Sequence, residues 1–456
     1  MDAVHRPPVA PDAGDEPRNE ADGPTGEHAA KVPQPLVQVP ADVDPLRHEA
    51  ANIRLNTLNG TLQSVSLNLY NPFLGIDIIR LGGTGWEVGL LSALPPLGQT
   101  LSTIAGARWL GGRANPKRAG ALTFAAARLL LLGLAAIHLG IRGGTAAGSW
   151  RPLALVSLVA LISLPGAVGN LSWQAVLTGL LRPSSRASAL AIRGVLASLA
   201  GVVVPLAAGW WARSDSGVGA YPWLYCLAAL VGLAEAAVFW SMRGNPPVAT
   251  RREPILPAAR RLWADGPYRA YTLCCLPFYL GWLMAWPLFT TYQVRVAHAT
   301  NLWMAGFTAV NSLAAAVGSA LWARFGNRAG ARLALPVACL LLTVVPLQYV
   351  FAPGLWGIAL SNVLGGLFGS GVNLFLLVRL MEVAPVEDRV VAMGVASTVL
   401  GAVGVAGPML GIALAHVLPM PGTFWVPTLL RASGGVALLA AARAGGRAIA
   451  RPAAVS

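Results

Sequence analysis

The feature that most constrains this chain is a series of long apolar runs, each about as long as a membrane-spanning helix. They fall at 54–79, 86–107, 118–140, 152–178, 188–212 and 219–241, and again at 269–293, 302–323, 331–351, 355–380, 391–415 and 423–444. A spanning helix needs about 20 predominantly apolar residues. Only 11% of the 456 residues are charged, against about 25% in a typical soluble domain. The runs therefore predict an all-α integral membrane protein with twelve transmembrane helices.

The basic residues are unevenly placed along the chain. They gather in the loops after the even-numbered runs and between the sixth and seventh runs, in positions that include Lys117, Arg186, Arg252 and Arg328. Basic loops of membrane proteins stay in the cytoplasm. We therefore expect a multi-pass protein of the plasma (inner) membrane with both termini cytoplasmic. The net charge of +14 does not indicate a nucleic-acid partner, because the bases lie in short loops rather than on one soluble face.

Composition divides the chain into two apolar halves and three polar segments. Residues 1–50 are rich in proline and acidic residues, which is typical of a disordered tail, and we expect no cleaved signal peptide there. We predict a cytoplasmic tail over 1–50, six-helix halves over 51–242 and 269–446, a cytoplasmic middle loop over 243–268, and a second tail over 447–456.

The two halves repeat the order of their polar and helix-breaking residues. Asn170 and Asn373 each stand sixteen residues before an arginine, Arg186 and Arg389 respectively. A glycine and a proline then recur at matching positions in the fifth and eleventh spans: Gly201 and Pro205, Gly404 and Pro408. Because proline loosens a helix locally, we expect these two spans to act as paired gating elements.

This organisation resembles the major facilitator superfamily, whose transporters have two parallel six-helix halves. The loops "LGGRANPKRAG" (110–120) and "LWARFGNRAGAR" (321–332) are similar to the family's loop after the second span, although Gly112 and Ala323 stand where the family has aspartate. The segment "GVAGPMLG" (404–411) is similar to its antiporter motif, which in the family lies in the fifth span. The resemblance implies gating roles for Arg113, Lys117, Pro205, Arg324, Gly326, Arg328, Gly404 and Pro408.

Polar residues on the first span lie on one face of a helix. Their steps of three and four residues have the period of an α-helix and include Asn56, Asn59, Gln63, Ser66, Tyr70, Phe73 and Asp77. Such a face either lines a solute path or forms a polar seam with another helix. The resemblance favours the path, because the family's first and seventh spans line its cavity. The substrate-binding residues predicted on this basis are Asn59, Gln63, Ser66, Tyr70, Asn170, Gln174, Tyr279, Trp282, Trp286, Asn362 and Asn373.

The chemistry of this wall indicates a substrate class. The aromatic stripe on the seventh span is consistent with either packing or ligand contact, and the remaining polar groups are mostly neutral amides. No arginine clamp is evident in the first, fourth or seventh span. The wall therefore favours a neutral or lipophilic cation-like substrate over a strongly anionic one.

Charged residues inside spans need partners, because each costs about 2.5–3.5 kcal/mol on insertion scales. Arg128 and Glu235 are expected to pair with each other. Asp77, one turn before Arg80, fits either a proton site or an interfacial ion pair. Asp77 and Glu235 are the predicted coupling residues, and Arg431 has no evident partner.

These features favour a secondary active transporter that moves a small organic solute by alternating access. Coupling to a proton or other ion gradient is expected, with export of drug-like or metabolite molecules ahead of nutrient uptake. An enzyme is disfavoured, since no cluster of histidine, aspartate or cysteine is evident, and a primary pump is disfavoured because the chain contains no phosphate-binding loop. A non-transporting sensor or assembly protein on the same fold remains an alternative. We expect a monomer in the lipid bilayer, without cofactor or metal.

Overall fold

The structure is a computed structural model that describes residues 48–111, 113, 115–139, 150–214, 219–244, 255–352, 354–385 and 389–449. Residues 45–456 form one compact unit. Most of the predicted tail over 1–50, the part of the middle loop that holds Arg252, and the last seven residues lie outside the described residues.

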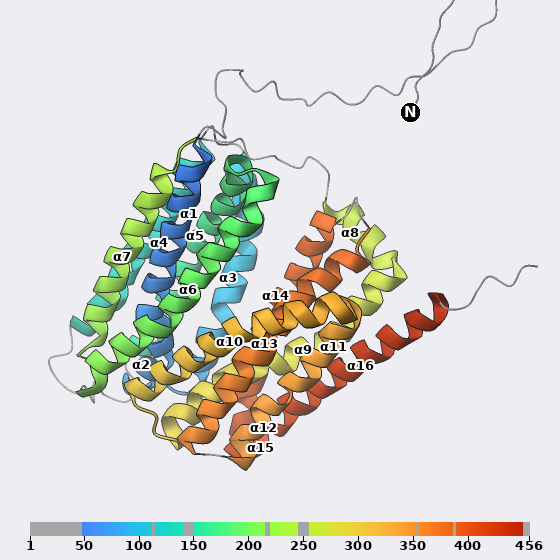
Figure 1. Ribbon diagram of the computed structural model, residues 1–456. Coiled ribbons are helices and arrows are strands. Elements are labelled where there is room, and N and C mark those ends of the chain that lie inside the picture. Colours follow the sequence, from blue (N-terminus) through green and yellow to red (C-terminus); the bar gives the residue numbers. More distant parts are fainter. Residues whose placement is uncertain are drawn as a thin grey trace, which may run out of the picture. The chain divides into compact units, whose positions relative to one another are not determined.

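The N-terminal half consists of helices joined by short connections (Figure 1). They are α1 (Glu49–Tyr70), η1 (Asn71–Phe73), α2 (Leu74–Arg80), α3 (Gly85–Gly111), α4 (Pro116–Leu139), α5 (Arg151–Leu180), α6 (Pro183–Trp211), η2 (Ala212–Ser214) and α7 (Tyr221–Ser241). The predicted first span is thus not one helix. Pro72 lies in η1, where a proline cannot continue the α-helical hydrogen-bond ladder, and the chain resumes as α2.

The C-terminal half begins with a short helix that the sequence assigned to the middle loop. Its elements are α8 (Ile255–Ala264), α9 (Gly266–Thr291), η3 (Tyr292–Val296), α10 (Asn301–Ala329), α11 (Ala331–Leu342), α12 (Val344–Phe351), α13 (Leu355–Val383), α14 (Arg389–Val417), α15 (Met420–Thr423) and α16 (Trp425–Ile449). Leu262 of α8 is buried with Tyr268 and Ala392. This linker helix therefore packs against α9 and α14 rather than lying free.

Ten of the described helices are long and apolar enough to cross a membrane by length and composition. The helices α1 and α3 fall outside that set. For α1 the reason is its content of polar residues: Asn52, Asn56 and Asn59 are all buried against other parts of the protein. Together, the ten candidate spans and the helices α1 and α3 confirm the predicted all-α membrane fold.

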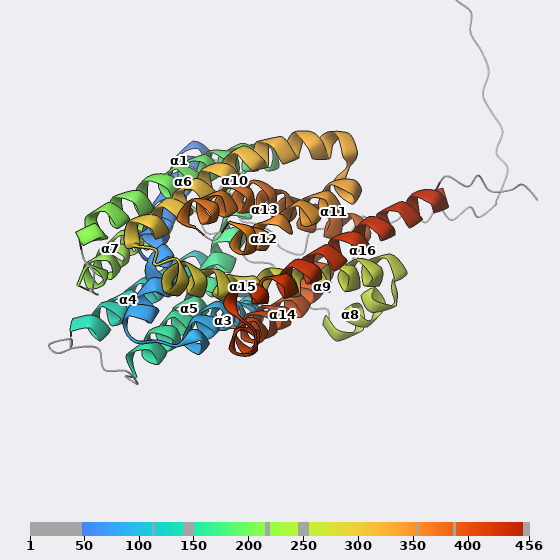
Figure 2. The same ribbon diagram turned by 90° about the horizontal axis from the view of Figure 1, so that it is seen from below.

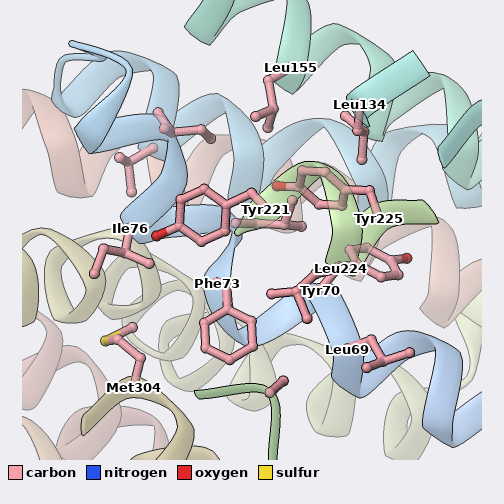
Figure 3. Close-up of a cluster of buried hydrophobic side chains, with 14 of the residues drawn as sticks. Leu69, Tyr70, Phe73, Ile76, Leu134, Leu155, Tyr221, Leu224, Tyr225 and Met304 are labelled. Atoms are coloured by element: carbon pink, nitrogen blue, oxygen red, sulfur yellow. The ribbon is translucent and has the colours of Figure 1, made fainter. Parts of the chain in front are cut away.

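Each half packs its own helices around an apolar core. In the N-terminal half α4 packs on α5 and α7, and α1 packs on α6 and α7. In the C-terminal half α10 packs on α13, and α9 packs on α14 and α16. A shared cluster joins the two halves: Tyr70, Phe73 and Tyr225 belong to it together with Met304 of α10 (Figure 3).

Candidate functional site

A polar cluster in the N-terminal half is built around Arg193 of α6, which is 8% exposed. Its Nη1 donates to Asn59 Oδ1 at 2.9 Å and to Asn56 Oδ1 at 3.2 Å, and its Nη2 donates to Gln63 Oε1 at 2.8 Å. The ring of Trp173 from α5 lies against the guanidinium, whose Cζ is 4.2 Å from the ring centroid. These partners of Arg193 are neutral amide oxygens of α1 and an aromatic face.

The orientation of the Asn56 side chain is fixed by two donors. Trp173 Nε1 donates to Asn56 Oδ1 at 3.0 Å, and the same oxygen accepts from Arg193. The Nδ2 group of Asn56 is buried and has no hydrogen-bond partner in the described structure. A buried donor without an acceptor costs about 1–3 kcal/mol, so this group is poised to donate to an incoming acceptor.

A buried ion pair lies beside this cluster. Arg128 of α4 donates from Nε (3.0 Å) and Nη2 (2.7 Å) to Glu235 Oε2 of α7. This confirms the pairing expected from the sequence. The second carboxylate oxygen, Oε1, is buried without a hydrogen-bond partner in the described structure. Asn59 links the two groups, because its Nδ2 donates to the backbone carbonyl of Glu235 at 3.1 Å.

A second buried carboxylate, Asp77 of α2, bonds to two side chains. His138 Nε2 of α4 lies 3.0 Å from Asp77 Oδ1, and the Tyr225 hydroxyl of α7 donates to Oδ2. His138 Nδ1 faces the carbonyl of Leu134 at 2.9 Å. A carbonyl only accepts, so Nδ1 carries a proton. The bond between Nε2 and Asp77 then requires another proton, held on the imidazole or on the carboxyl group.

The Asp77–His138 pair lies close to the other half of the protein. The His138 ring centroid is 6.1 Å from that of Tyr221, and the Tyr221 hydroxyl donates to Asn301 Oδ1 of α10 at 2.9 Å. The same hydroxyl accepts from Arg80 Nη1 at 2.8 Å. Figure 3 shows Tyr221 and Tyr225 side by side on one helix. Asn301 in turn donates to the carbonyl of Ala212 at 3.0 Å, which ties α10 to the N-terminal half.

The two halves meet along two symmetry-related helix pairs, α6 with α10 and α3 with α14 (Figures 1 and 2). A Cβ built on Gly201 would lie 3.4 Å from Ser312 Cβ, and one on Gly404 would lie 3.2 Å from Pro96 Cβ. Further along the same helices, Gly194 of α6 and Gly394 of α14 face open space.

The inter-half contacts therefore lie toward one end of the helices. Trp86 at the start of α3 stacks on His416 at the end of α14, and Arg295 donates to the carbonyl of Gly83 at 2.6 Å. These residues lie far from the basic segments around Lys117 and Arg328. The contact end of the helices is thus opposite the end that carries the clustered bases.

Comparisons with known proteins agree with this architecture. Residues 271–453 match the family model of the Major Facilitator Superfamily. The C-terminal half of the chain thus matches the major facilitator superfamily by sequence. This confirms the resemblance drawn from the sequence.

Solved structures of similar fold are transporters of the superfamily. A bacterial homologue of the human lysosomal transporter Spinster, inward-facing and unoccupied, shares 16% identity over 87% of this chain and 96% of its own, with a TM-score of 0.59. A variant of the peptide transporter POT shares 15% identity over 89% and 99%, with a TM-score of 0.64. A bacterial homologue of the iron transporter ferroportin, inward-facing, shares 13% identity over 86% and 99%, with a TM-score of 0.67. No curated protein matches the sequence.

The predicted residues of the first span lie in different surroundings. Asn59 and Gln63 contact Arg193, whereas Ser66 is buried and donates to the backbone carbonyl of Ala228 at 2.7 Å. Tyr70 is also buried, in the shared apolar cluster. One face of α1 thus contributes both to the polar cluster and to the helix seam that the sequence left as the alternative.

The matched asparagines of the superfamily halves differ in their contacts. Asn373 is exposed and its Nδ2 donates to Gly369 of its own helix at 3.0 Å. Asn362 likewise donates to Ile358 at 2.9 Å. Asn170 and Gln174 are exposed on α5, on either side of Trp173. The two fourth-span residues thus flank Trp173 in the sequence of α5, while the tenth-span amides bond within their own helix.

The predicted aromatic residues of the seventh span pack mainly within the C-terminal half. Tyr279 and Trp282 pack against its core, and their ring centroids are 5.7 Å apart. Trp286 is 55% exposed. Arg431, which had no evident partner in the sequence, is buried and donates to the carbonyls of Gly281, Leu342 and Trp282 at 3.1–3.4 Å.

The residues predicted to gate the superfamily fold are divided between loop ends and helix contacts. Lys117 donates to the carbonyl of Met242 at the end of α7, and Arg113 lies over the ring of Trp109. Gly326 faces the Phe375 ring of α13. Pro205 and Pro408 are buried, whereas Arg324 and Arg328 are exposed.

Two site residues were missed by sequence reasoning, Arg193 and His138. Arg193 follows a serine-rich helix start and resembles the neighbouring loop bases, so its charge signals topology as readily as a site. His138 stands near the end of the apolar run over 118–140, with no other polar residue beside it in the sequence. A signal was present for Arg193 only: it lies well inside the predicted span over 188–212, where a charge needs a partner.

No group of three or more histidine, cysteine, aspartate or glutamate residues in the described part of the chain could hold a metal ion.

Proposed function

We propose that this protein is a secondary active transporter that moves a small organic solute by alternating access between its two halves. The observation that carries the proposal is the one-ended contact between the halves. Gly201 and Gly404 lie against the opposite half, whereas Gly194 and Gly394 face open space. Arg193, next to Gly194 on α6, thus stands just beyond the contact. A buried polar cluster beside the end at which these glycines do not touch the opposite half is suited to binding a solute.

Orientation follows from the basic loops. If these face the cytoplasm, the end of the helices at which the halves touch faces outward, and the opposite end faces inward. The inward-facing states of the Spinster and ferroportin homologues are consistent with this assignment. Transport then requires the α6–α10 and α3–α14 contacts to open at the outer end while the inner end closes.

We further propose that protons drive the cycle. Asp77 bonds to His138, whose ring packs against that of Tyr221, and the Tyr221 hydroxyl donates to Asn301 of the opposite half. Glu235 has one carboxylate oxygen without a hydrogen-bond partner in the described structure, which can take a proton. Gain or loss of a proton at Asp77 changes the charge beside the Tyr221–Asn301 contact between the halves. This is the physical requirement for coupling.

Export of a drug-like or metabolite molecule remains ahead of nutrient uptake. The "GVAGPMLG" segment lies on α14, where Gly407 and Gly411 pack closely on Leu283 and Met284 of α9. These close contacts between α14 and α9 support a role for this segment of α14 in the conformational change. Uptake by symport uses the same residues, and a sensor or assembly protein would bind a solute without moving it.

The test is transport by purified protein in proteoliposomes. A thermal-shift screen first identifies solutes that stabilise the folded protein, and the flux of each is then measured with and without an imposed pH gradient. We expect gradient-driven accumulation by the wild type. Asp77→Asn should abolish accumulation but retain solute exchange. Stabilising solutes that never cross the membrane would favour the sensor alternative.

A further inference from the structure

The charges of the Arg193 cluster and of the ion pair beside it do not cancel. Arg128 and Arg193 are each at most 8% exposed, and Glu235 is fully buried. Both nitrogens that bond to Glu235 belong to Arg128. Arg193 instead bonds to Asn56, Asn59 and Gln63. The cluster therefore holds two guanidinium groups against one carboxylate.

A buried charge without a counter-ion is costly, even where neutral groups solvate it. Amide oxygens satisfy the donors of Arg193 but do not neutralise its charge. A carboxylate is a stronger acceptor for a guanidinium than an amide, because the bond is charge-assisted. A planar guanidinium group that is stacked on an aromatic ring is also well suited to bind a carboxylate through two parallel hydrogen bonds. The stack of Arg193 on Trp173 supplies that geometry.

A second, independent group at the same place also lacks an acceptor. Asn56 Nδ2 is buried and has no hydrogen-bond partner in the described structure, and its orientation is fixed because Oδ1 accepts from both Trp173 and Arg193. An incoming anion offers the missing acceptor. A cation offers none and is repelled by two guanidinium groups.

Residues next to the site are exposed, although Arg193 and Asn56 themselves are buried. Gly194, the residue after Arg193, faces open space. Asn170 and Gln174 are exposed on α5 on either side of Trp173. These amides flank Trp173 in the sequence of α5, and the ring of Trp173 lies against the guanidinium of Arg193.

We propose that Arg193, with Asn56 and Trp173, binds the carboxylate of a monoanionic organic solute. This inference rests on the proposed transport function and specifies its substrate class. It replaces the neutral or cation-like substrate expected from the first, fourth and seventh predicted spans. The charge that reverses this preference belongs to Arg193, which lies on the fifth predicted span, α6. One negative charge balances the cluster, which favours a monoanion.

The test compares matched probes that differ in one charge. Three carboxylates and their primary amides are titrated against purified wild-type protein: benzoate and benzamide, indole-3-acetate and indole-3-acetamide, octanoate and octanamide. We expect at least one carboxylate to bind about tenfold or more tightly than its amide. Binding of every amide as tightly as its carboxylate would overturn the proposal.

Variants then assign the preference to Arg193. Arg193→Gln should bring the carboxylate and its amide to within about threefold of each other. Arg213→Gln is the matched control, because Arg213 stacks on Trp210 with its Cζ 4.0 Å from the ring centroid but is exposed; it should keep the wild-type ratio. If Arg193→Gln does not fold, Arg193→Lys decides: the carboxylate should weaken about tenfold while its amide does not change. An unchanged ratio in the folded variant would overturn the assignment.

Flux separates this inference from the proposed function. Gradient-driven transport of tryptamine, the cationic analogue of the indole pair, without transport of indole-3-acetate would keep the transporter and reject the anion site. Arg193-dependent binding of a carboxylate without flux would keep the site and reject transport.

Discussion

Two glycines give the buried arginines of the N-terminal half their space. A Cβ on Gly60 of α1 would overlap Cγ and Nε of Arg193, and a Cβ on Gly232 of α7 would overlap the side chain of Arg128. Each arginine therefore lies across the backbone of a neighbouring helix. The position of the guanidinium depends on the absence of a single methyl group.

Gly60→Ala should move Arg193 away from Trp173 without unfolding the protein, because a long side chain can shift. We expect carboxylate binding to weaken about tenfold, with a melting temperature within a few degrees of the wild type. Gly166→Ala on α5 is the control, since a Cβ there meets nothing. Titration calorimetry on both variants checks the prediction, which is wrong if the two bind alike.

The Arg128–Glu235 pair should show the asymmetry of a buried ion pair. Glu235→Gln leaves the guanidinium without its anionic partner and should destabilise the protein by about 3–5 kcal/mol. The double variant Arg128→Met with Glu235→Gln should recover most of that loss, because a neutral pair of similar volume carries no buried charge. The free energy of unfolding of each variant, measured in mixed detergent, checks both predictions. A double variant as unstable as the single one would contradict the pairing argument.

The paired helices α6 and α14 place their matched glycines at equivalent inter-half contacts. Gly201 lies against Ser312 of α10, and Gly404 against Pro96 of α3. The matched positions of these glycines in the two halves of the sequence thus correspond to equivalent contacts between the halves. This supports the gating role proposed for the fifth and eleventh spans.

Gly404→Leu should impair transport more than folding. The larger side chain cannot fit against Pro96, so it disfavours the conformation in which α3 and α14 touch. We expect at least a tenfold loss of flux with near-normal yield of folded protein. Ala402→Leu, on an exposed face of the same helix, should transport normally. Equal flux in both variants would show that close packing at Gly404 is unnecessary.

The sequence predicted the helices well because hydropathy is a local property. Its runs agree with α3, α4, α5 and α7 to within a few residues. It did not predict the break at η1 or the linker helix α8. Pro72 could have signalled the first. The linker helix α8 lies in a short polar stretch, and its buried side chain Leu262 packs with residues of α9 and α14.

The site was less predictable because its partners are distant in sequence. Arg193 bonds to residues more than 100 positions earlier, and His138 bonds to Asp77 on a different helix. The spacing on the first span did identify one polar face. It could not tell that Asn59 would contact an arginine while Ser66 would bond to the backbone of α7. Those outcomes depend on which helix packs on which face.

The topology of the whole chain is testable independently of any substrate. We expect the segments that hold Lys117, Arg186, Arg252 and Arg328 to be cytoplasmic, because basic loops are retained there. Single cysteines introduced beside them, in a protein without its four native cysteines, should resist membrane-impermeant reagents added from outside. A cysteine at Val296, which is exposed near the contact end, is the accessible control. Outside labelling at two or more of the basic segments would contradict the assigned orientation.

Alternating access requires the two halves to separate at the end where they now touch. Gly201 and Ser312 offer a direct way to prevent this, since their Cβ atoms would lie 3.4 Å apart, close to the ~3.5–4.5 Å spacing of a disulfide. The variant Gly201→Cys with Ser312→Cys, in the same cysteine-free protein, should cross-link under mild oxidation.

The decisive measurement is the flux of a stabilising solute through this double variant in proteoliposomes, before oxidation, after oxidation and after reduction. The account predicts that the cross-link stops flux almost completely, that reduction restores it, and that either single cysteine variant is unaffected by oxidation. Undiminished flux through quantitatively cross-linked protein would contradict alternating access between these two halves.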